Sequence, residues 1–195
     1  MNVPRRELEI ALRRAAGYER ALYLGALLAR AIDGPVIITG GSAIDVYASG
    51  TEPSLDLDFV TPGGTRPRAT RVLASWGFVP NGKNWRRDDW EIEVDLRGSE
   101  FRGSRSRARR FETPYGPVWV AGPEDLLVKR LAELKHWPTA GDWREALLRQ
   151  ISLLLSEEGE TMDEEYLSFL ARRDDVLDIL AEFRTRVRPR GNGRS

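Results

Sequence analysis

The chain has 195 residues, and its 41% hydrophobic content is enough for the core of one domain or of a domain with an extension. It contains no cysteine, which excludes disulfides, thiolate zinc sites and cysteine nucleophiles. The 30 basic and 30 acidic residues cancel, so the net charge does not indicate nucleic-acid binding. Residues 1–20 carry charge throughout and contain no continuous apolar run, so we expect a cytoplasmic protein with no membrane partner.

The N-terminal part of the chain predicts helices, then a strand, a turn and a second strand. Apolar residues recur at helical spacing over residues 5–32, with a break at Gly17. The β-branched run at residues 36–39 predicts a short strand, and the glycine pair after it predicts a tight turn into a short helix over residues 43–48. Residues 55–60 alternate apolar and acidic side chains, which is typical of a strand.

The central part predicts a helix, a hairpin and two further strands. Asn81-Gly82 is a strong turn pair, so we expect the segments on either side of it to form a hairpin. Residues 98–110 are rich in glycine and arginine, and they predict a polar loop. The remaining elements expected here are a helix over residues 66–76 and strands over residues 90–96 and 118–120.

After residue 121 the pattern becomes helical, with helices expected over residues 124–135, 143–156 and 163–186. We therefore predict an α/β (α+β) fold, in which helices flank a mixed β-sheet. The expected organisation is a core with its helical lead-in over residues 1–121, a helical C-terminal portion over residues 122–187 and a disordered tail over residues 188–195.

Two carboxylates stand close together in the second predicted strand. Asp56 and Asp58 are two positions apart, so their side chains point to the same face of the sheet. Neighbouring anions repel each other unless a cation compensates them, and hard divalent ions such as Mg²⁺ or Mn²⁺ bind carboxylate oxygens. Metal pairs of this kind serve phosphoryl transfer and need carboxylates that can bridge them. The strand therefore predicts a metal site.

A third carboxylate is available on the strand predicted over residues 90–96, where Glu91, Glu93 and Asp95 share one face. We select Asp95, because it is short and lies near the C-terminal end of its strand, where sites in open sheets tend to form. Glu93 remains the alternative, since the alternation serves either residue equally well.

The glycine pair predicts a phosphate site beside these acids. Gly40 and Gly41 lie at a strand-to-helix turn, where the absence of Cβ lets a ligand approach the backbone closely. The N–H groups of Ser42 and Ala43, which open the expected helix, lack partners within it and lie at the positive end of its dipole. The Ser42 hydroxyl adds a further donor.

Taken together, Gly40-Gly41-Ser42, Asp56-Leu57-Asp58 and the later acidic strand resemble the signature of the polymerase-β-like nucleotidyltransferase superfamily. The segments from Thr39 to Ala43 and from Ser54 to Phe59 are most similar to small bacterial nucleotidyltransferases related to abortive-infection (AbiEii-type) toxins. The resemblance covers residues 30–130. It implies the nucleotidyltransferase fold, an NTP substrate with Mg²⁺ or Mn²⁺, and an antitoxin protein as partner.

The same families continue with a Pro-Glu-Asp-Leu segment and a helix that bears a lysine. Here residues 123–129 match, so the resemblance implies that Lys129 lies near the triphosphate. An Arg-Asp pair and a further acidic residue often follow. Asp142 and Glu145 fit that pattern, but Ala140-Gly141 replaces the arginine.

The main hypothesis is a metal-dependent transfer of NMP from an NTP to an acceptor hydroxyl. The expected catalytic and metal-binding residues are Asp56, Asp58 and Asp95, and the expected nucleotide-binding residues are Gly40, Gly41, Ser42 and Lys129. The acceptor candidates are tRNA or another RNA in a toxin-like role, a protein side chain, and a small molecule such as an aminoglycoside. The alternative functions are a catalytically idle nucleotide-binding or regulatory module of the same fold, and an antibiotic-modifying nucleotidyltransferase.

Overall fold

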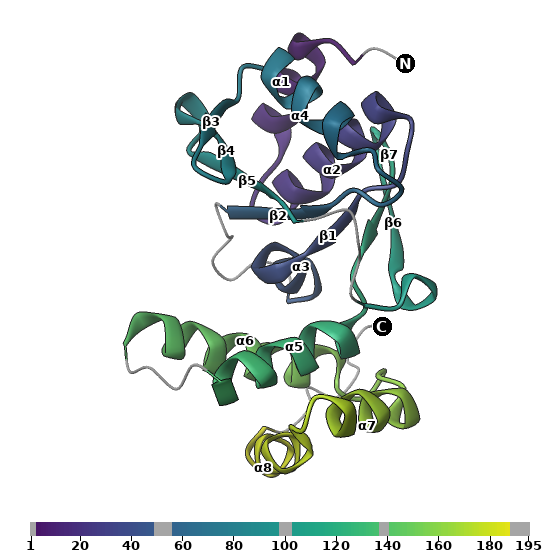
Figure 1. The fold of residues 1–195 in the computed structure, drawn as a ribbon, viewed down its shortest axis with the longest axis vertical. Helices are drawn as coiled ribbons and strands as arrows, with labels where there is room; N and C mark the ends of the chain where they lie inside the picture. The colour runs from purple at the N-terminus through teal and green to yellow at the C-terminus, as the bar shows by residue number, and fades with distance from the viewer. Residues whose placement is uncertain (1–2, 49–55, 98–102, 137–140, 188–195) are drawn as a thin grey trace. The chain divides into compact units, whose positions relative to one another are not determined.

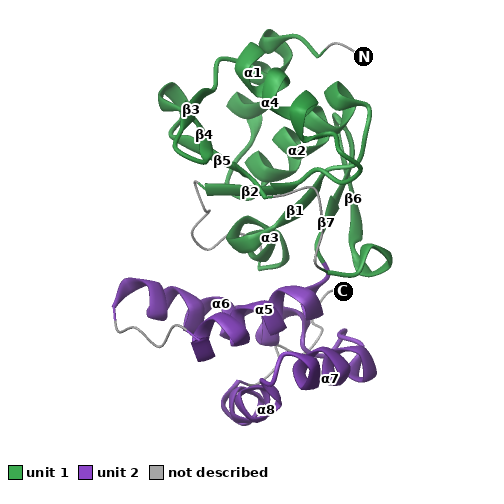
Figure 2. Ribbon diagram, in the orientation of Figure 1, with its two compact units in different colours: residues 1–121 green, residues 122–195 purple. Residues whose placement is uncertain are grey.

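The computed structural model describes residues 3–48, 56–97, 103–136 and 141–187. The chain divides into two compact units, unit 1 over Met1–Ala121 and unit 2 over Gly122–Ser195 (Figure 2). The tail expected over residues 188–195 lies outside the described residues.

Unit 1 is built on a mixed β-sheet, as predicted (Figure 1). Within the described residues, seven strands form this sheet in the order β3-β4-β5-β2-β1-β7-β6. β1 pairs in parallel with β7, β2 pairs in parallel with β5, and the other neighbours are antiparallel. The strands are β1 (Ile37–Thr39), β2 (Asp56–Val60), β3 (Val79–Asn81), β4 (Asn84–Arg87), β5 (Ile92–Leu96), β6 (Arg109–Thr113) and β7 (Gly116–Val120).

The second helix of unit 1 covers the apolar face of the sheet at two of its strands. A Cβ added at Gly25 of the second helix would lie 2.9 Å from Cγ2 of Val118 and 3.5 Å from Cδ1 of Ile38, so this helix packs closely on β1 and β7. Ile38 is paired with Phe59 on β2, which places Phe59 on the same helix-covered face. The helices of this unit are α1 (Arg5–Arg14), α2 (Glu19–Ile32), α3 (Gly40–Tyr47) and α4 (Arg66–Ser75), with 3₁₀ turns η1 (Asp88–Trp90) and η2 (Arg105–Arg107).

The alternation of β2 follows from this burial. Leu57 and Phe59 are 2% and 0% exposed, because they point toward the helices. Asp56 and Asp58 take the alternate positions of the strand and therefore point to the opposite face. The carboxylates are thus placed on one surface of the sheet by the same periodicity that builds the core.

Unit 2 consists, in its described part, of α5 (Pro123–His136), α6 (Asp142–Glu158), α7 (Glu164–Arg173) and α8 (Leu177–Arg186). The acidic pair at the start of α5 holds the start of α7. Glu124 is 5% exposed and accepts a hydrogen bond from the backbone N–H of Asp163 at 2.9 Å, while Tyr166 donates its hydroxyl to Asp125 at 2.9 Å. Asp163 in turn caps α7 by accepting the N–H of Tyr166 at 3.0 Å.

Two local predictions in unit 1 are wrong. Arg109 and Arg110, predicted as the end of the polar loop, begin the edge strand β6, since an edge position tolerates charged side chains. Glu91 does not share a strand with Glu93 and Asp95: it has a left-handed backbone, with φ of 52°, and β5 begins only at Ile92. Residues 98–102 of the expected loop lie outside the described residues.

No helix in the described ranges is long and apolar enough to cross a membrane.

Candidate active site

The acidic face of the sheet is formed by two parallel neighbours, β2 and β5. Their register pairs Asp56 with Glu93 and Asp58 with Asp95. Paired positions of adjacent strands face the same side, so four carboxylates occupy one surface of the sheet. The structure therefore brings Asp58 and Asp95 together directly, and Asp56 lies one pleat away on β2.

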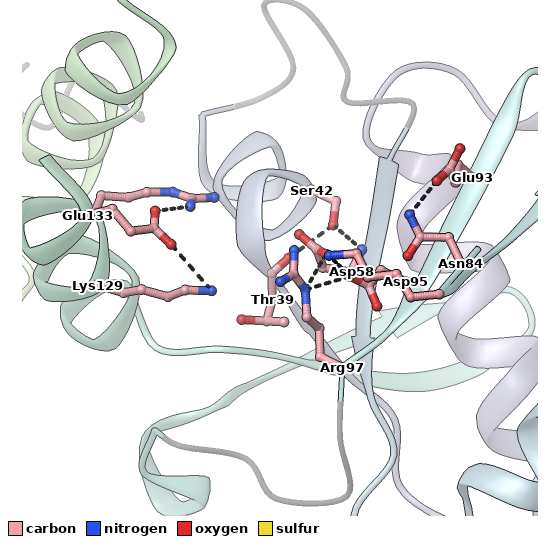
Figure 3. A network of polar contacts seen from close by, with 11 residues as sticks. Thr39, Ser42, Asp58, Asn84, Glu93, Asp95, Arg97, Lys129 and Glu133 are labelled. Atoms are coloured by element: carbon pink, nitrogen blue, oxygen red, sulfur yellow. Dashed lines mark hydrogen bonds and ion pairs between the residues drawn. The ribbon is translucent and has the colours of Figure 1, made fainter. Parts of the chain in front are cut away.

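Arg97 links the two central acids. Its Nε lies 2.9 Å from Oδ1 of Asp58 and 3.0 Å from Oδ2 of Asp95. Figure 3 draws the three side chains together. The Asp58 and Asp95 side chains are 11% and 13% exposed, whereas the Arg97 side chain is 47% exposed. Two mostly buried carboxylate oxygens thus converge on one cationic group.

Glu93 is held differently from Asp95. Its carboxylate accepts a hydrogen bond from the side-chain amide of Asn84 (Figure 3). It accepts a second, at 3.3 Å, from the side-chain amide of Asn81. Both asparagines belong to the β3–β4 hairpin, so Glu93 is tied toward that edge of the sheet. The geometry favours Asp95 over Glu93 as the partner of Asp58.

Asp56 lies at the exposed start of β2. Burial raises the pKa of its carboxyl above the ordinary value, and the nearby negative charges of Glu93, Asp58 and Asp95 raise this pKa further. Repulsion between these neighbouring carboxylates thus adds to the effect of burial on Asp56. A bound cation would relieve that repulsion.

Gly40 forms the contact between the acidic surface and the start of α3. Its φ of +67° is left-handed, and a Cβ placed there would lie 1.7 Å from Oδ2 and 2.6 Å from Cγ of Asp58. No side chain fits in that space, so the glycine is required by both conformation and contact. The Asp58 carboxylate consequently packs directly against the backbone at the N-terminus of a helix.

The helix begins earlier than the sequence predicts. α3 starts at Gly40 rather than at Ala43, so the N–H groups without partners inside the helix include those of Gly40, Gly41 and Ser42. These donors and the positive end of the helix dipole favour an anion at this end of α3. The phosphate site stays a prediction, and the observed start of α3 adds the N–H groups of Gly40 and Gly41 to its candidate donors.

The Ser42 hydroxyl has backbone partners within unit 1. It donates to the carbonyl of Thr39 at 3.1 Å and accepts the N–H of Asp58 at 3.4 Å, and the residue is 1% exposed. In this arrangement the side chain fastens the first turn of α3 to β2. It thereby fixes the position of Asp58 relative to the glycine pair.

The chemistry of the donor set fits a hard divalent cation, since Asp58 and Asp95 direct oxygen atoms at a common point. Within the described residues there is no preformed group of three or more His, Cys, Asp or Glu side chains that could hold a metal ion. Asp56, the third predicted ligand, lies on the same surface but does not complete such a group.

Lys129, the remaining predicted site residue, belongs to α5 in unit 2. Its side chain is 42% exposed, and its Nζ lies 4.0 Å from Oε1 of Glu133, one helical turn later. Asp142 and Glu145 lie in the first turn of α6, also in unit 2. The part of Lys129 in phosphate binding stays a prediction.

Arg97 is the residue of this site that the sequence reading missed. It follows Asp95 by two positions, so strand alternation alone would have placed its side chain on the acidic face.

The fold is similar to that of nucleotidyltransferases of known structure. The solution structure of the antibiotic-resistance factor ANT(2″)-Ia gives a TM-score of 0.56 at 16% identity, covering 85% of this chain and 90% of that chain. A crystal structure of ANT(2″)-Ia in complex with adenylyl-2″-tobramycin gives 0.53 at 16% identity, over 85% and 96%. An antigenic nucleotidyltransferase-like protein from Paracoccidioides brasiliensis gives 0.54 at 14% identity, over 87% and 94%.

At these identities the likeness establishes the fold alone. No protein-family model and no curated protein matches the sequence.

Proposed function

We propose that this protein is a metal-dependent nucleotidyltransferase, which transfers NMP from an NTP to an acceptor hydroxyl. The observation that carries the proposal is the contact between Gly40 and Asp58, together with the pairing of Asp58 with Asp95. These contacts support the proposal because a helix N-terminus that could bind an anion lies beside an acid pair that could bind a cation. A nucleotide triphosphate with its divalent metal needs both kinds of site in immediate proximity.

In this proposal Asp58 and Asp95 would hold Mg²⁺ or Mn²⁺, with Asp56 as a third ligand. The bound metal supplies charge neutralisation at the reacting phosphate. The N–H groups of Gly40, Gly41 and Ser42 bind phosphate oxygens, and Lys129 is proposed to reach the triphosphate on the strength of the family resemblance. The rigid glycine turn would hold the α-phosphorus in place for attack.

The reaction forms one P–O bond and breaks another. The acceptor hydroxyl oxygen attacks the α-phosphorus, the bond between the α-phosphorus and the bridging oxygen breaks, and pyrophosphate leaves with that electron pair. Asp95, as the carboxylate beside Asp58, is proposed to accept the proton of the acceptor hydroxyl. Positioning and electrostatic stabilisation would supply most of the rate enhancement.

Two acceptor classes follow from different observations. The resemblance to AbiEii-type toxins supports a tRNA end or other RNA as acceptor, with an antitoxin protein as partner. The fold similarity to ANT(2″)-Ia, whose complex contains adenylyl-2″-tobramycin, supports a small-molecule hydroxyl as the second candidate.

The test is an acceptor panel. The purified protein is incubated with each α-labelled NTP and Mg²⁺ or Mn²⁺, in parallel with pooled tRNA, with aminoglycosides and with cell extract. We expect label to enter one acceptor class in the wild type and to be lost with Asp58→Ala. Glu112→Ala, which removes an exposed acid on β6, is the control and should transfer at the wild-type rate. A wild type that labels no acceptor would favour the catalytically idle module.

A further inference from the structure

Arg97 directly follows β5 and reaches back over the acidic surface. Its backbone N–H donates to the carbonyl of Phe59 at 2.8 Å, which continues the contact of β5 with β2 beyond Leu96. This backbone contact fixes the side of the sheet on which the guanidinium lies. Its Nε then sits between Asp58 and Asp95, at 2.9 Å and 3.0 Å (Figure 3).

The three side chains differ sharply in burial. Asp58 and Asp95 are close to nine-tenths buried, and their Cα positions are register partners, whereas nearly half of the Arg97 side chain is exposed. Removing the guanidinium would leave two mostly buried anions side by side. Lys83 would still lie near one of them, with its Nζ 4.0 Å from Oδ2 of Asp95. Such a pair is costly without a cation, while a half-exposed arginine can return to water at little cost.

Arg97 uses the oxygens that the proposed function assigns to the metal. Oxygen ligands approach Mg²⁺ to about 2.0–2.1 Å, which is shorter than the distances from Nε to these two carboxylates. A divalent ion between the acids would therefore occupy the place of the guanidinium. The two cations exclude each other sterically and repel each other electrostatically.

We propose that Arg97 is a positioning residue that acts as an internal counter-ion for the acid pair. It keeps Asp58 and Asp95 convergent while no metal is bound, and it moves aside when a divalent cation enters. Arg97 therefore sets the metal concentration at which the site fills. This inference rests on the proposed function, because it concerns the metal position of that site.

The test measures metal binding directly and without nucleotide. Mn²⁺ is titrated into the full-length protein, and free Mn²⁺ is followed by electron paramagnetic resonance. With Arg97→Met we expect Mn²⁺ to bind at least about tenfold more tightly than in the wild type, because the competing positive charge is gone. Arg97→Lys keeps the charge but loses the planar fork, and it should give a smaller gain.

A matched control comes from β6, where Arg110 is 53% exposed and pairs with Glu112 at 2.9 Å. Arg110→Met should leave Mn²⁺ affinity within about twofold of the wild type, since a solvent-exposed charge is screened beyond about 10 Å. Adding Asp58→Asn to Arg97→Met should abolish the tight site. If Arg97→Met fails to fold, Arg97→Lys carries the same comparison.

Unchanged or weaker Mn²⁺ binding in the Arg97 variants, or no binding in any variant, would overturn the inference. The same preparations are assayed for NMP transfer, which separates the two claims. A wild type that transfers NMP, with unchanged Mn²⁺ affinity in the Arg97 variants, rejects the inference alone. Tighter Mn²⁺ binding in Arg97→Met without any NMP transfer in the wild type rejects the proposed function alone.

Discussion

Gly40 serves both the backbone turn into α3 and the packing of the Asp58 carboxylate. Its left-handed conformation and the 1.7 Å approach of Oδ2 of Asp58 to the position of a Cβ are independent reasons for glycine. The first reason concerns the stability of the turn. The second concerns the position of a proposed metal ligand, so the two can be separated by experiment.

Gly40→Ala should lower both stability and transfer. The left-handed backbone costs an alanine about 1–2 kcal/mol, and overpacking against Asp58 adds about 1–3 kcal/mol. We expect NMP transfer to fall roughly 100-fold, because the carboxylate is displaced from its productive position. Urea unfolding and the rate of label transfer measure the two effects.

Gly63→Ala is the control for this substitution, because Gly63 has a similar φ of +74° and no atom within 4 Å of an added Cβ. It should lose about 1–2 kcal/mol of stability with transfer intact. Equal transfer rates in the two alanine variants would show that Gly40 serves the turn alone.

Asp95 and Glu93 are expected to differ in their effect on transfer. Asp95→Asn removes the charge beside Asp58 and should reduce transfer by roughly 100-fold or more. Glu93→Gln removes a carboxylate that the two hairpin asparagines hold away from that pair, so transfer should stay within about tenfold of the wild type. Steady-state rates at saturating NTP decide between them, and the opposite ranking would transfer the third-carboxylate role to Glu93.

At the scale of elements, Arg87 connects several parts of unit 1 around the end of β4. It is 3% exposed and donates to the carbonyl of Trp76 at 2.8 Å, to Glu9 at 2.8 Å and to Asp89 at 2.9 Å. Its guanidinium also lies 4.6 Å from the ring centroid of Trp90. One buried cation thus fastens α1, the end of α4 and η1 to the β3–β4 hairpin.

Arg87→Met should therefore destabilise the protein by about 2–4 kcal/mol, because charged hydrogen bonds of a buried group are lost together. The neighbouring Arg86 is 54% exposed and pairs with Asp88 at 2.5 Å, so Arg86→Met should change stability by no more than about 0.5 kcal/mol. Denaturant unfolding of both variants makes the comparison. Similar losses in the two would contradict the connecting role of Arg87.

The same cluster predicts how stability depends on acid. A hydrogen bond from Arg5 and then one from Arg87 hold the pKa of Glu9 below its ordinary value, and the hydrogen bond from Arg87 lowers the pKa of Asp89. A lowered pKa in the folded state stabilises the protein above the unfolded pKa of about 4. That contribution is lost as the pH falls through the lower, folded pKa.

Wild-type stability should thus fall more steeply than that of Arg87→Met between about pH 5 and about pH 3. Thermal melting across this range measures the difference. Parallel pH profiles of the two proteins would contradict the assigned origin of the pKa shifts.

Local sequence patterns predict most helices and strands of unit 1. They do not predict how the strands pair with one another. Alternation placed Asp56 and Asp58 on one face, as β2 shows, because burial of Leu57 and Phe59 dictates that side. Alternation alone could not choose between Glu93 and Asp95. That choice depends on the register of β2 with β5, which is set by contacts between segments far apart in the chain.

Other details depended on tertiary context in a similar way. The arginines at the start of β6 favour a loop prediction, although they lie in an edge strand. Glycine's poor helix propensity favours a later start for α3 than the observed Gly40. Alternation after Asp95 fits the side of the sheet on which Arg97 lies, but its contact with Asp58 depends on the pairing of β5 with β2. Each of these features depends on the tertiary contacts that the segment makes in the folded protein.

For the whole molecule, the central claim is that the protein transfers the α-phosphoryl group of an NTP with its nucleoside. The most direct measurement compares α-labelled with γ-labelled NTP, in the presence of Mg²⁺ or Mn²⁺ and the acceptor found in the panel. The proposed NMP transfer predicts that α-label enters the acceptor, that γ-label appears only in pyrophosphate, and that Asp58→Asn loses both signals. Transfer of the γ-label to the acceptor, or α-label transfer that persists with Asp58→Asn, would contradict it.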